Sequence, residues 1–217
     1  MVDNRLLRGL DEAQRRLLQQ RMLRHRYPKG DTVFHAGDTG DTLHMIAKGH
    51  VAVRVGTPLG EVATLTILGP GDAFGELALV SPKSLRTASV VALDALETQS
   101  LDRRTFNEIR LHDPRMDRML VSILAAQVER LTDHLLDALY CSAEMRMIRR
   151  LRDLTILYGA ENGVEIPLTQ EDLATMAGTT RPTANRVLRE LADAGILELA
   201  RGRIVVNSQA GLAKRAR

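Results

Sequence analysis

The chain has 217 residues, of which 44% are hydrophobic and 26% charged, and its net charge is +3, a composition typical of a soluble globular protein with room for two modest domains. No apolar run approaches the roughly 20 residues that span a bilayer, and the opening stretch MVDNRLLRGLDEAQRR has no apolar core, so we expect neither a membrane span nor a signal peptide. The single cysteine, Cys141, excludes an internal disulfide, a Cys-ligated zinc site and an iron–sulfur cluster held by four cysteines, and a cytoplasmic protein is expected.

From Pro28 to about Leu101, short β-rich runs alternate with Gly-Asp turns. The runs TVF, TLHMIA, HVAVRV and VATLTIL are typical of strands. Pairs such as Gly30-Asp31 and Gly71-Asp72 stand between them and tolerate the backbone angles of tight turns. Turns this frequent predict a compact all-β barrel or roll. Only 3% of the chain is aromatic, so aliphatic residues must build its core.

From Asp113 the stretch DPRMDRMLVSILAAQVERLTDHLLDALY predicts one long helix, with no glycine and its only proline near the start, where a helix accepts it. Apolar residues recur every three or four positions along one face: Leu120, Leu124, Val128, Leu131, Leu135 and Leu139. This face can pack on the chain's own barrel or pair with a second copy. The length, about 27 residues, favours a second copy.

The rest of the chain predicts a winged helix-turn-helix. After Ser142, AEMRMIRRLRDLTILYG predicts a helix that ends at its glycine. The next helix starts at Thr169 in TQEDLATMAG, and another starts in TTRPT, with Pro182 in its first turn. Two short helices joined by a tight turn form a helix-turn-helix, and ILELARGRIVV follows as a hairpin with Gly202 in its turn.

In such a motif the start of the second helix faces base edges in the major groove. The candidate base and phosphate contacts there are Thr180, Arg181, Thr183, Asn185, Arg186 and Arg189. Thr169 and Gln170, at the start of the first helix, can hold phosphates. A helical hairpin with ordinary surface arginines is the alternative. Residues 144–217 hold 12 basic and 9 acidic side chains, the whole positive excess of the chain, and together with the wing this favours double-stranded DNA as the partner.

The order of these parts resembles the cyclic-AMP receptor protein and fumarate–nitrate regulator (Crp/Fnr) family of bacterial transcription factors, from about Arg24 to Asn207. FGELAL followed by RTA resembles that family's phosphate-binding cassette, and TRPTANRVLRELADAGILE resembles its recognition helix and the lead into the wing. The resemblance implies an α+β fold. Its parts are a cyclic-nucleotide-binding, jelly-roll-like β-roll with an N-terminal helix (1–112), a dimerisation helix (113–140) and a winged helix-turn-helix (141–217).

The cassette has side chains suited to a cyclic phosphodiester, which carries one negative charge and leaves the ribose 2′-hydroxyl free. The candidate phosphate-binding residues are Gly75, Leu77, Ala78, Arg86 and Thr87. Arg86 can donate two N–H bonds to the phosphate, and the amides at a short helix start can cradle the anion. Glu76 can accept from the 2′-hydroxyl. The alternative is that Glu76 and Arg86 merely pair across a turn.

The resemblance also implies contacts with the adenine from Val53, Leu65, Leu68 and, on the long helix, Thr132. Two positions depart from the cyclic-AMP receptor protein. Leu131-Thr132 stands where that protein has two hydroxyl residues, and Pro182 stands where it has a glutamate that reads a base. The loop GAENGVEIP is shorter than its polymerase-contacting counterpart. The implied partners are DNA with two-fold half-sites, a second copy of the chain and RNA polymerase.

The sequence therefore predicts a homodimeric transcription regulator switched by a cyclic nucleotide, cyclic AMP more than cyclic GMP. A regulator of the same fold that answers to another effector, or to none, is the alternative, and the set Glu76, Arg86 and Thr87 argues against a lost pocket. A nucleotide hydrolase is least favoured, because the histidines and carboxylates show neither metal-ligand nor paired-carboxylate spacing. We thus expect no catalytic residue and no metal site.

Overall fold

The computed structural model describes residues 12–57, 60–81, 85–159 and 163–216. The start of the chain, for which no signal peptide is expected, and residues 160–162 of the loop GAENGVEIP lie outside the described residues. The chain divides into two compact units, Met1–Val55 with Leu68–Leu131 and Gly56–Ile67 with Thr132–Arg217. The predicted domain boundaries after residues 112 and 140 stay a prediction. Among the described helices, none is both long and apolar enough to cross a membrane.

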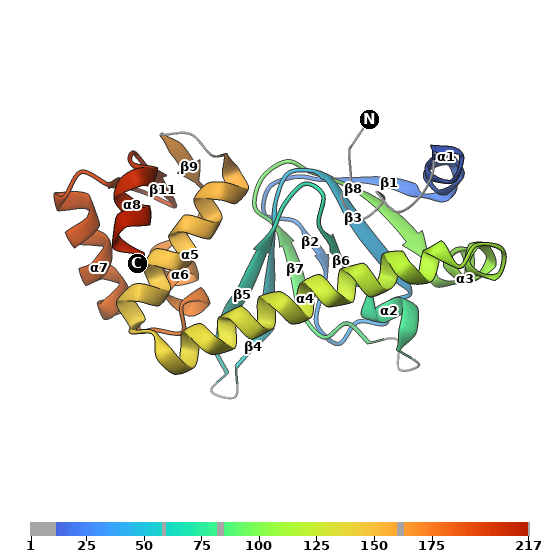
Figure 1. Cartoon of the computed structure of the whole chain (residues 1–217), viewed down its shortest axis with the longest axis horizontal. Coiled ribbons are helices and arrows are strands. Elements are labelled where there is room, and N and C mark those ends of the chain that lie inside the picture. Colours follow the sequence, from blue (N-terminus) through green and yellow to red (C-terminus); the bar gives the residue numbers. More distant parts are fainter. Residues whose placement is uncertain (1–11, 58–59, 82–84, 160–162, 217) are drawn as a thin grey trace. The chain divides into compact units, whose positions relative to one another are not determined.

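Eight strands form two four-stranded sheets (Figure 1). The first sheet has the order β1 (Leu23–Tyr27), β8 (Leu96–Asp102), β3 (Thr42–Lys48) and β6 (Ala73–Phe74). The second has the order β2 (Thr32–Phe34), β7 (Ser89–Ala92), β4 (Val51–Gly56) and β5 (Val62–Leu68). β3 and β8 pair antiparallel, with Leu43 opposite Leu101. The four predicted strand runs are confirmed as β2, β3, β4 and β5.

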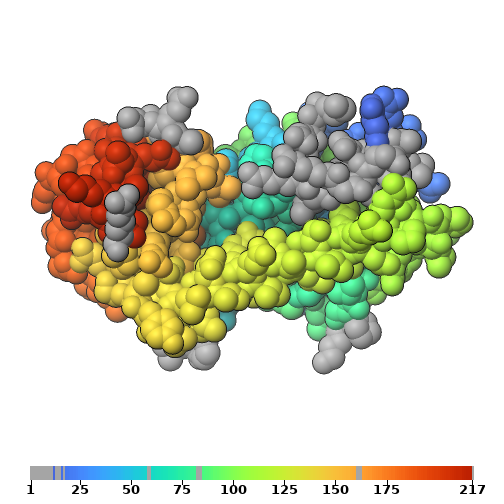
Figure 2. All heavy atoms as spheres, viewed as in Figure 1, coloured from blue at the N-terminus to red at the C-terminus, as the bar shows by residue number. Residues whose placement is uncertain are grey.

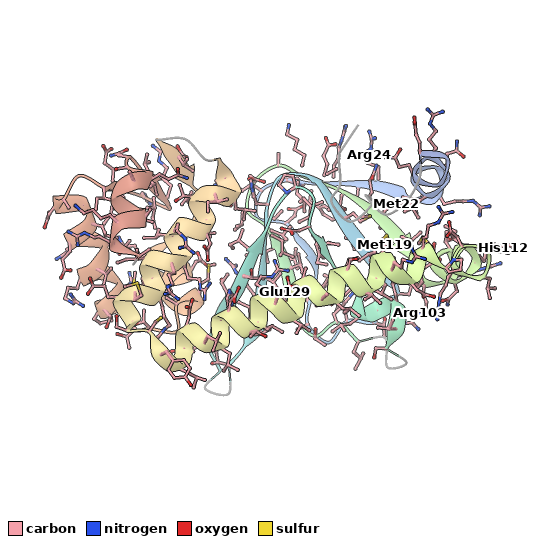
Figure 3. All side chains as sticks on the ribbon, viewed as in Figure 1. Met22, Arg24, Arg103, His112, Met119 and Glu129 are labelled. Atoms are coloured by element: carbon pink, nitrogen blue, oxygen red, sulfur yellow. The ribbon has the colours of Figure 1, made fainter. Side chains whose placement is uncertain are left out.

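Helices complete the core of the first unit. They are α1 (Glu12–Arg21), α2 (Leu77–Val80), α3 (Arg103–His112) and the first part of α4 (Arg115–Tyr140). Their apolar side chains pack with those of β3 and β8 in one cluster: Leu18, Met22, Leu43, Met45, Ala73, Leu79, Leu101, Phe106, Met116, Met119, Leu120 and Ile123. Figure 3 labels Met22 and Met119 within this unit. As expected from the composition, Phe106 is the only aromatic member of this cluster of described residues.

Sequence reasoning predicted neither α3 nor the exact start of the long helix. α3 begins directly after β8, because the Asp102 carboxylate accepts from the Thr105 amide at 2.8 Å and caps the first turn. The long helix begins at Arg115 rather than Asp113. Asp113 remains outside it, and its carboxylate accepts from the Arg115 amide at 3.0 Å.

The apolar face of α4 is divided between two environments. Leu120 and Ile123 are buried in the cluster of the first unit, and Leu124 packs against it. Further along, Val128, Leu131, Leu135 and Leu139 are exposed. Figure 2 shows the side chains of α4 as an uncovered ridge on the visible face. Packing on the chain's own barrel therefore accounts for the beginning of the face, whereas the four later side chains are largely exposed.

The second unit contains the predicted helices and wing. They are α5 (Ala143–Tyr158), α6 (Gln170–Met176), α7 (Arg181–Asp193), and the hairpin β10 (Leu197–Ala200) and β11 (Arg203–Val206). Sequence reasoning missed β9 (Val164–Ile166), which makes β11 the centre of a three-stranded sheet, and the terminal helix α8 (Gln209–Arg215). Four apolar side chains of α7 and the isoleucine that follows the helix are buried: Ala184, Val187, Leu188, Leu191 and Ile196.

A buried charge cluster joins the end of α4 to α5. The carboxylate of Asp137 accepts from Arg150 at 2.9 Å and from Arg149. Asp137 and Arg150 are both buried. Asp137 raises the pKa of Arg149, because its carboxylate stabilises the charged guanidinium. Two ion pairs thus link these two helices, and the one between Asp137 and Arg150 is shielded from water.

Candidate effector pocket and nucleic-acid interface

Arg86 is buried against the start of β3. Its Nη1 donates to the Thr42 carbonyl at 2.8 Å and its Nη2 donates to the Thr42 hydroxyl at 2.7 Å. Its Cζ lies 4.0 Å from the centre of the Phe34 ring, a cation–π contact. Its Nε is buried and has no hydrogen-bond acceptor among the described residues. The guanidinium is therefore firmly held, and its buried Nε–H has no acceptor within the described residues.

Gly75 brings the backbone close to this guanidinium. Its φ is +80°, in the left-handed region, and a Cβ there would lie 2.6 Å from Nη1 of Arg86 and 2.8 Å from the Thr42 carbonyl oxygen. Any side chain would meet both strain and a clash. The backbone at Gly75 therefore lies close to Arg86 and Thr42, with no room for a side chain between them.

Glu76 immediately precedes α2 and is 5% exposed. Its side chain makes no capping hydrogen bond to that helix. The short predicted helix exists, as α2, and Leu77 and Ala78 form its first turn. The Ala78 amide donates to the Gly75 carbonyl at 3.1 Å. The carboxylate is therefore buried without being used to cap the helix beside it.

Burial lowers the pKa of Arg86, and the carboxylates of Asp41, Glu76 and Asp38 act in the opposite direction. Glu76 and Arg86 thus interact electrostatically within one buried site. With a basic and an acidic group together, the site has a donor for an anion and an acceptor for a hydroxyl. This is the pair of functions that a cyclic nucleotide requires.

Behind Arg86 lies a buried histidine. The Nε2 of His44 is 3.3 Å from the Thr42 hydroxyl, and its Nδ1 is 3.3 Å from the Thr98 hydroxyl. Its ring stacks on Phe74, with the ring centres 5.1 Å apart. Burial lowers the pKa of His44 to about 3, helped by the charges of Arg86 and His25. His44 is consequently neutral near pH 7 and adds no positive charge to the site.

The remaining expected effector residues are more scattered. Thr87 is exposed directly after Arg86. Val53 packs against the core beside Val90, and Leu68 is buried in the same cluster. Leu65 on β5 and Thr132 on α4 are exposed and belong to the second unit. Within the described residues, no group of three or more His, Cys, Asp or Glu side chains is arranged to hold a metal ion.

The nucleic-acid candidates gather on α7. Thr180 caps this helix, with its side chain accepting from the Thr183 amide, and Pro182 lies in the first turn. A shallow surface hollow is lined by Arg181, Pro182, Asn185, Arg186, Arg189, Glu190 and Asp193. Arg186 pairs with Glu190 at 2.6 Å, whereas Arg181 lies 4.0 Å from Glu171.

At the start of α6, the two predicted phosphate contacts differ in their surroundings. The Thr169 hydroxyl accepts from the Asp172 amide at 3.0 Å, and the Asp172 carboxylate accepts from the Thr169 amide at 3.2 Å, which together make a capping box. Gln170, the first residue of the helix, is half-buried. The capping box explains why the chain turns into a helix here.

One arginine ties the helix-turn-helix to the end of α4. Arg146 on α5 donates to the carbonyl of Cys141 at 2.9 Å. The same guanidinium donates to Ala177 at 2.7 Å and Gly178 at 2.9 Å, which form the turn between α6 and α7. Sequence reasoning missed Arg146 because its acceptors are backbone carbonyls, and missed Thr42 because its own backbone carbonyl is one of the two acceptors for Arg86; such contacts leave no residue pattern.

Comparisons with known proteins agree with this geometry. The model of the cyclic nucleotide-binding domain matches residues 24–113, and that of the Crp-like helix-turn-helix domain matches residues 129–215. The CRP-like cAMP-activated global transcriptional regulator of Mycobacterium tuberculosis (strain ATCC 25618 / H37Rv) is 32% identical over 195 residues, which cover 88% of this chain and 87% of that protein.

The Cyclic AMP receptor protein of Thermus thermophilus is 32% identical over 210 residues, covering 97% of this chain and 95% of that protein. A solved structure of the c-di-GMP responsive global regulator CLP of Xanthomonas campestris has a TM-score of 0.74 at 22% identity and covers 91% of this chain and 100% of that chain. At that identity the likeness concerns the fold alone.

Proposed function

Because the chain belongs to the Crp family of DNA-binding transcription regulators, we propose that it acts as a homodimer whose affinity for double-stranded DNA is controlled by a cyclic nucleotide, with cyclic AMP preferred over cyclic GMP. The family is one of regulators and not of enzymes, which sets the hydrolase alternative aside. Family membership also supports a cytoplasmic place of action and RNA polymerase as a partner.

The observation that carries the effector proposal is the burial of Glu76 and Arg86 in one site. Arg86 bonds the cyclic phosphate, using the Nε that has no acceptor among the described residues, with the Thr87 hydroxyl and the Leu77 amide as further donors, since the Ala78 amide already donates to Gly75. Glu76 accepts from the ribose 2′-hydroxyl. Val53, Leu65, Leu68 and Thr132 are the proposed contacts with the adenine.

The exposed part of α4 supports the dimer. Val128, Leu131, Leu135 and Leu139 follow one another at helical spacing and are all exposed. A second copy of the same face buries them, which is the arrangement of a two-helix seam. The two recognition helices then reach half-sites one DNA turn apart, roughly 34 Å. The base and phosphate contacts proposed for each are Thr169, Gln170, Thr180, Arg181, Thr183, Asn185, Arg186 and Arg189.

Calorimetric titration of cyclic AMP and cyclic GMP tests the effector. The wild type is expected to bind cyclic AMP in the micromolar range, and Arg86→Leu is expected to bind neither nucleotide. Arg26→Leu is the matched control, since Arg26 is an exposed arginine that pairs with Glu97 at 3.1 Å. If the wild type fails to bind, or Arg86→Leu binds as well as the wild type, the proposal is overturned in favour of another effector or none.

Selection from a random duplex library, with and without cyclic AMP, tests the output. A symmetric site should be enriched only when cyclic AMP is present, because effector and DNA affinities are coupled reciprocally. Equal enrichment in both selections would contradict control by cyclic AMP. It would leave DNA binding itself intact.

A further inference from the structure

Arg103, the first residue of α3, donates hydrogen bonds to the C-terminal part of helix α2; Figure 3 labels this arginine. Its Nε donates to the carbonyl oxygen of Ala78 at 2.6 Å. Its Nη2 donates to the same oxygen and, at 3.1 Å, to the carbonyl oxygen of Ser81. One guanidinium thus bonds the backbone of α2 at two positions.

α2 needs such support because it is only four residues long. The amides of Leu79 and Ser81 donate to Glu76 at 2.9 Å and Leu77 at 2.7 Å, which amounts to a single turn. An isolated turn of helix is unstable, and its last carbonyls have no partner within the helix. The guanidinium supplies the missing donors, and its charge lies at the negative end of the helix.

The backbone of Arg103 is bonded to the segment that precedes Thr42. Its amide donates to the Asp41 carbonyl at 2.8 Å. Asp41 directly precedes Thr42, the residue that accepts twice from Arg86. Arg103 itself is fixed in space because the cap made by Asp102 anchors the start of α3. A single residue is therefore bonded both to the chain that supports Arg86 and to the helix that follows Glu76.

We propose that Arg103 is a positioning residue of the effector pocket, which sets the separation between the helix after Glu76 and the strand start beneath Arg86. The inference rests on the proposed function, since it assigns Arg103 a role in effector binding. Spacing in the sequence does not show the contact, because the acceptors are main-chain oxygens 25 and 22 residues earlier in the chain.

The test compares Arg103→Ala and Arg103→Lys with Arg104→Ala in the full chain. Arg104 is the matched control, since it lies on the same helix, pairs with Glu108 at 3.0 Å and has a side chain that is 89% exposed. Calorimetry gives the cyclic AMP affinity, and hydrogen exchange of the ligand-free protein gives the protection of the Leu79 and Ser81 amides.

Arg103→Ala should weaken cyclic AMP binding about tenfold or more and accelerate exchange at both amides, because charged hydrogen bonds to the helix end are lost. Arg103→Lys should weaken binding about threefold, because an ammonium keeps the charge but does not span two carbonyls. Arg104→Ala should match the wild type in affinity and exchange.

The outcomes separate this inference from the function on which it rests. No binding of either cyclic nucleotide by the wild type overturns the proposed function and, with it, an effector role for Arg103. If the wild type binds cyclic AMP and Arg103→Ala binds it with equal affinity, the positioning role alone is overturned. If protection is also lost throughout β3, the alanine variant has unfolded, and Arg103→Lys decides: wild-type affinity in that variant overturns the proposal.

Discussion

Arg86 and Thr42 are joined twice, once through the carbonyl oxygen of Thr42 and once through its hydroxyl, at 2.8 and 2.7 Å. Thr42→Val removes the hydroxyl and keeps the carbonyl. We expect the free energy of unfolding to fall by about 1–2 kcal/mol, because a buried guanidinium loses one acceptor. Chemical denaturation measures it. The same change at Thr32 on β2 is the control, and an equal effect at both positions would contradict the assignment.

His44 should make stability depend on pH. Its pKa in the folded chain is about 3, below the ordinary value of 6.5. Between those values the unfolded chain takes up a proton that the folded chain does not, so the free energy of unfolding falls as the pH falls below about 6.5. Relative to His44→Gln, the wild type should lose about 1 kcal/mol per pH unit from pH 6 to pH 4. Parallel pH profiles for the two proteins would rule this out.

Asp137 accepts hydrogen bonds from two guanidiniums at the junction of α4 and α5. Asp137→Asn should lower the free energy of unfolding by about 2 kcal/mol, because the buried Arg150 loses its buried counter-charge and keeps only the half-exposed Asp153, at 3.3 Å. Thermal unfolding followed by circular dichroism measures the change. Asp133→Asn, at an exposed position one turn earlier, should have almost no effect. Equal midpoints for the two variants would show that the cluster is energetically neutral.

Arg181 should contact a base and contribute to the DNA sequence preference. It is exposed at the first position of α7, and no carboxylate lies closer than Glu171 at 4.0 Å among the ion pairs of the described residues. Arg181→Ala should relax preference at one base pair by about 1–3 kcal/mol. Competition binding with single-base variants of the selected site measures this, with Arg152→Ala on α5 as the control. Uniform weakening on every sequence would make Arg181 a phosphate contact.

Leu135 should lie in the dimer seam. Its side chain is exposed on α4. Leu135→Glu is expected to convert the dimer into a monomer, because a charge at a buried seam position is costly to desolvate. Light scattering coupled to size exclusion measures the mass. Leu111→Glu, at a leucine that is 83% exposed on α3, should remain dimeric. A monomeric wild type would contradict the dimer proposal.

The features that the sequence predicted are local ones. Glycine at position 75 fits a backbone with positive φ, which other residues rarely adopt. Thr169 and Asp172 predict the start of α6, because a capping box needs both residues at that spacing. The apolar face of α4 was predictable because apolar residues recur there with the period of a helix.

The features that it did not predict depend on tertiary packing. Arg103 and Arg146 bond main-chain carbonyls that any residue could supply, so no pattern of residue types marks the contacts. The burial of Leu120 and the exposure of Leu135 follow equally regular spacing in one helix, and only the surrounding fold distinguishes them.

Because Arg86 is anchored in the folded chain, its rotamer entropy is lost on folding and not on ligand binding. Immobilising a free arginine side chain costs about 2 kcal/mol of rotamer entropy. Phe34 and Thr42 already immobilise this one within the fold. An arriving anion therefore meets a side chain that is already ordered, and its rotamer entropy is lost once, when the chain folds, rather than again at each binding event.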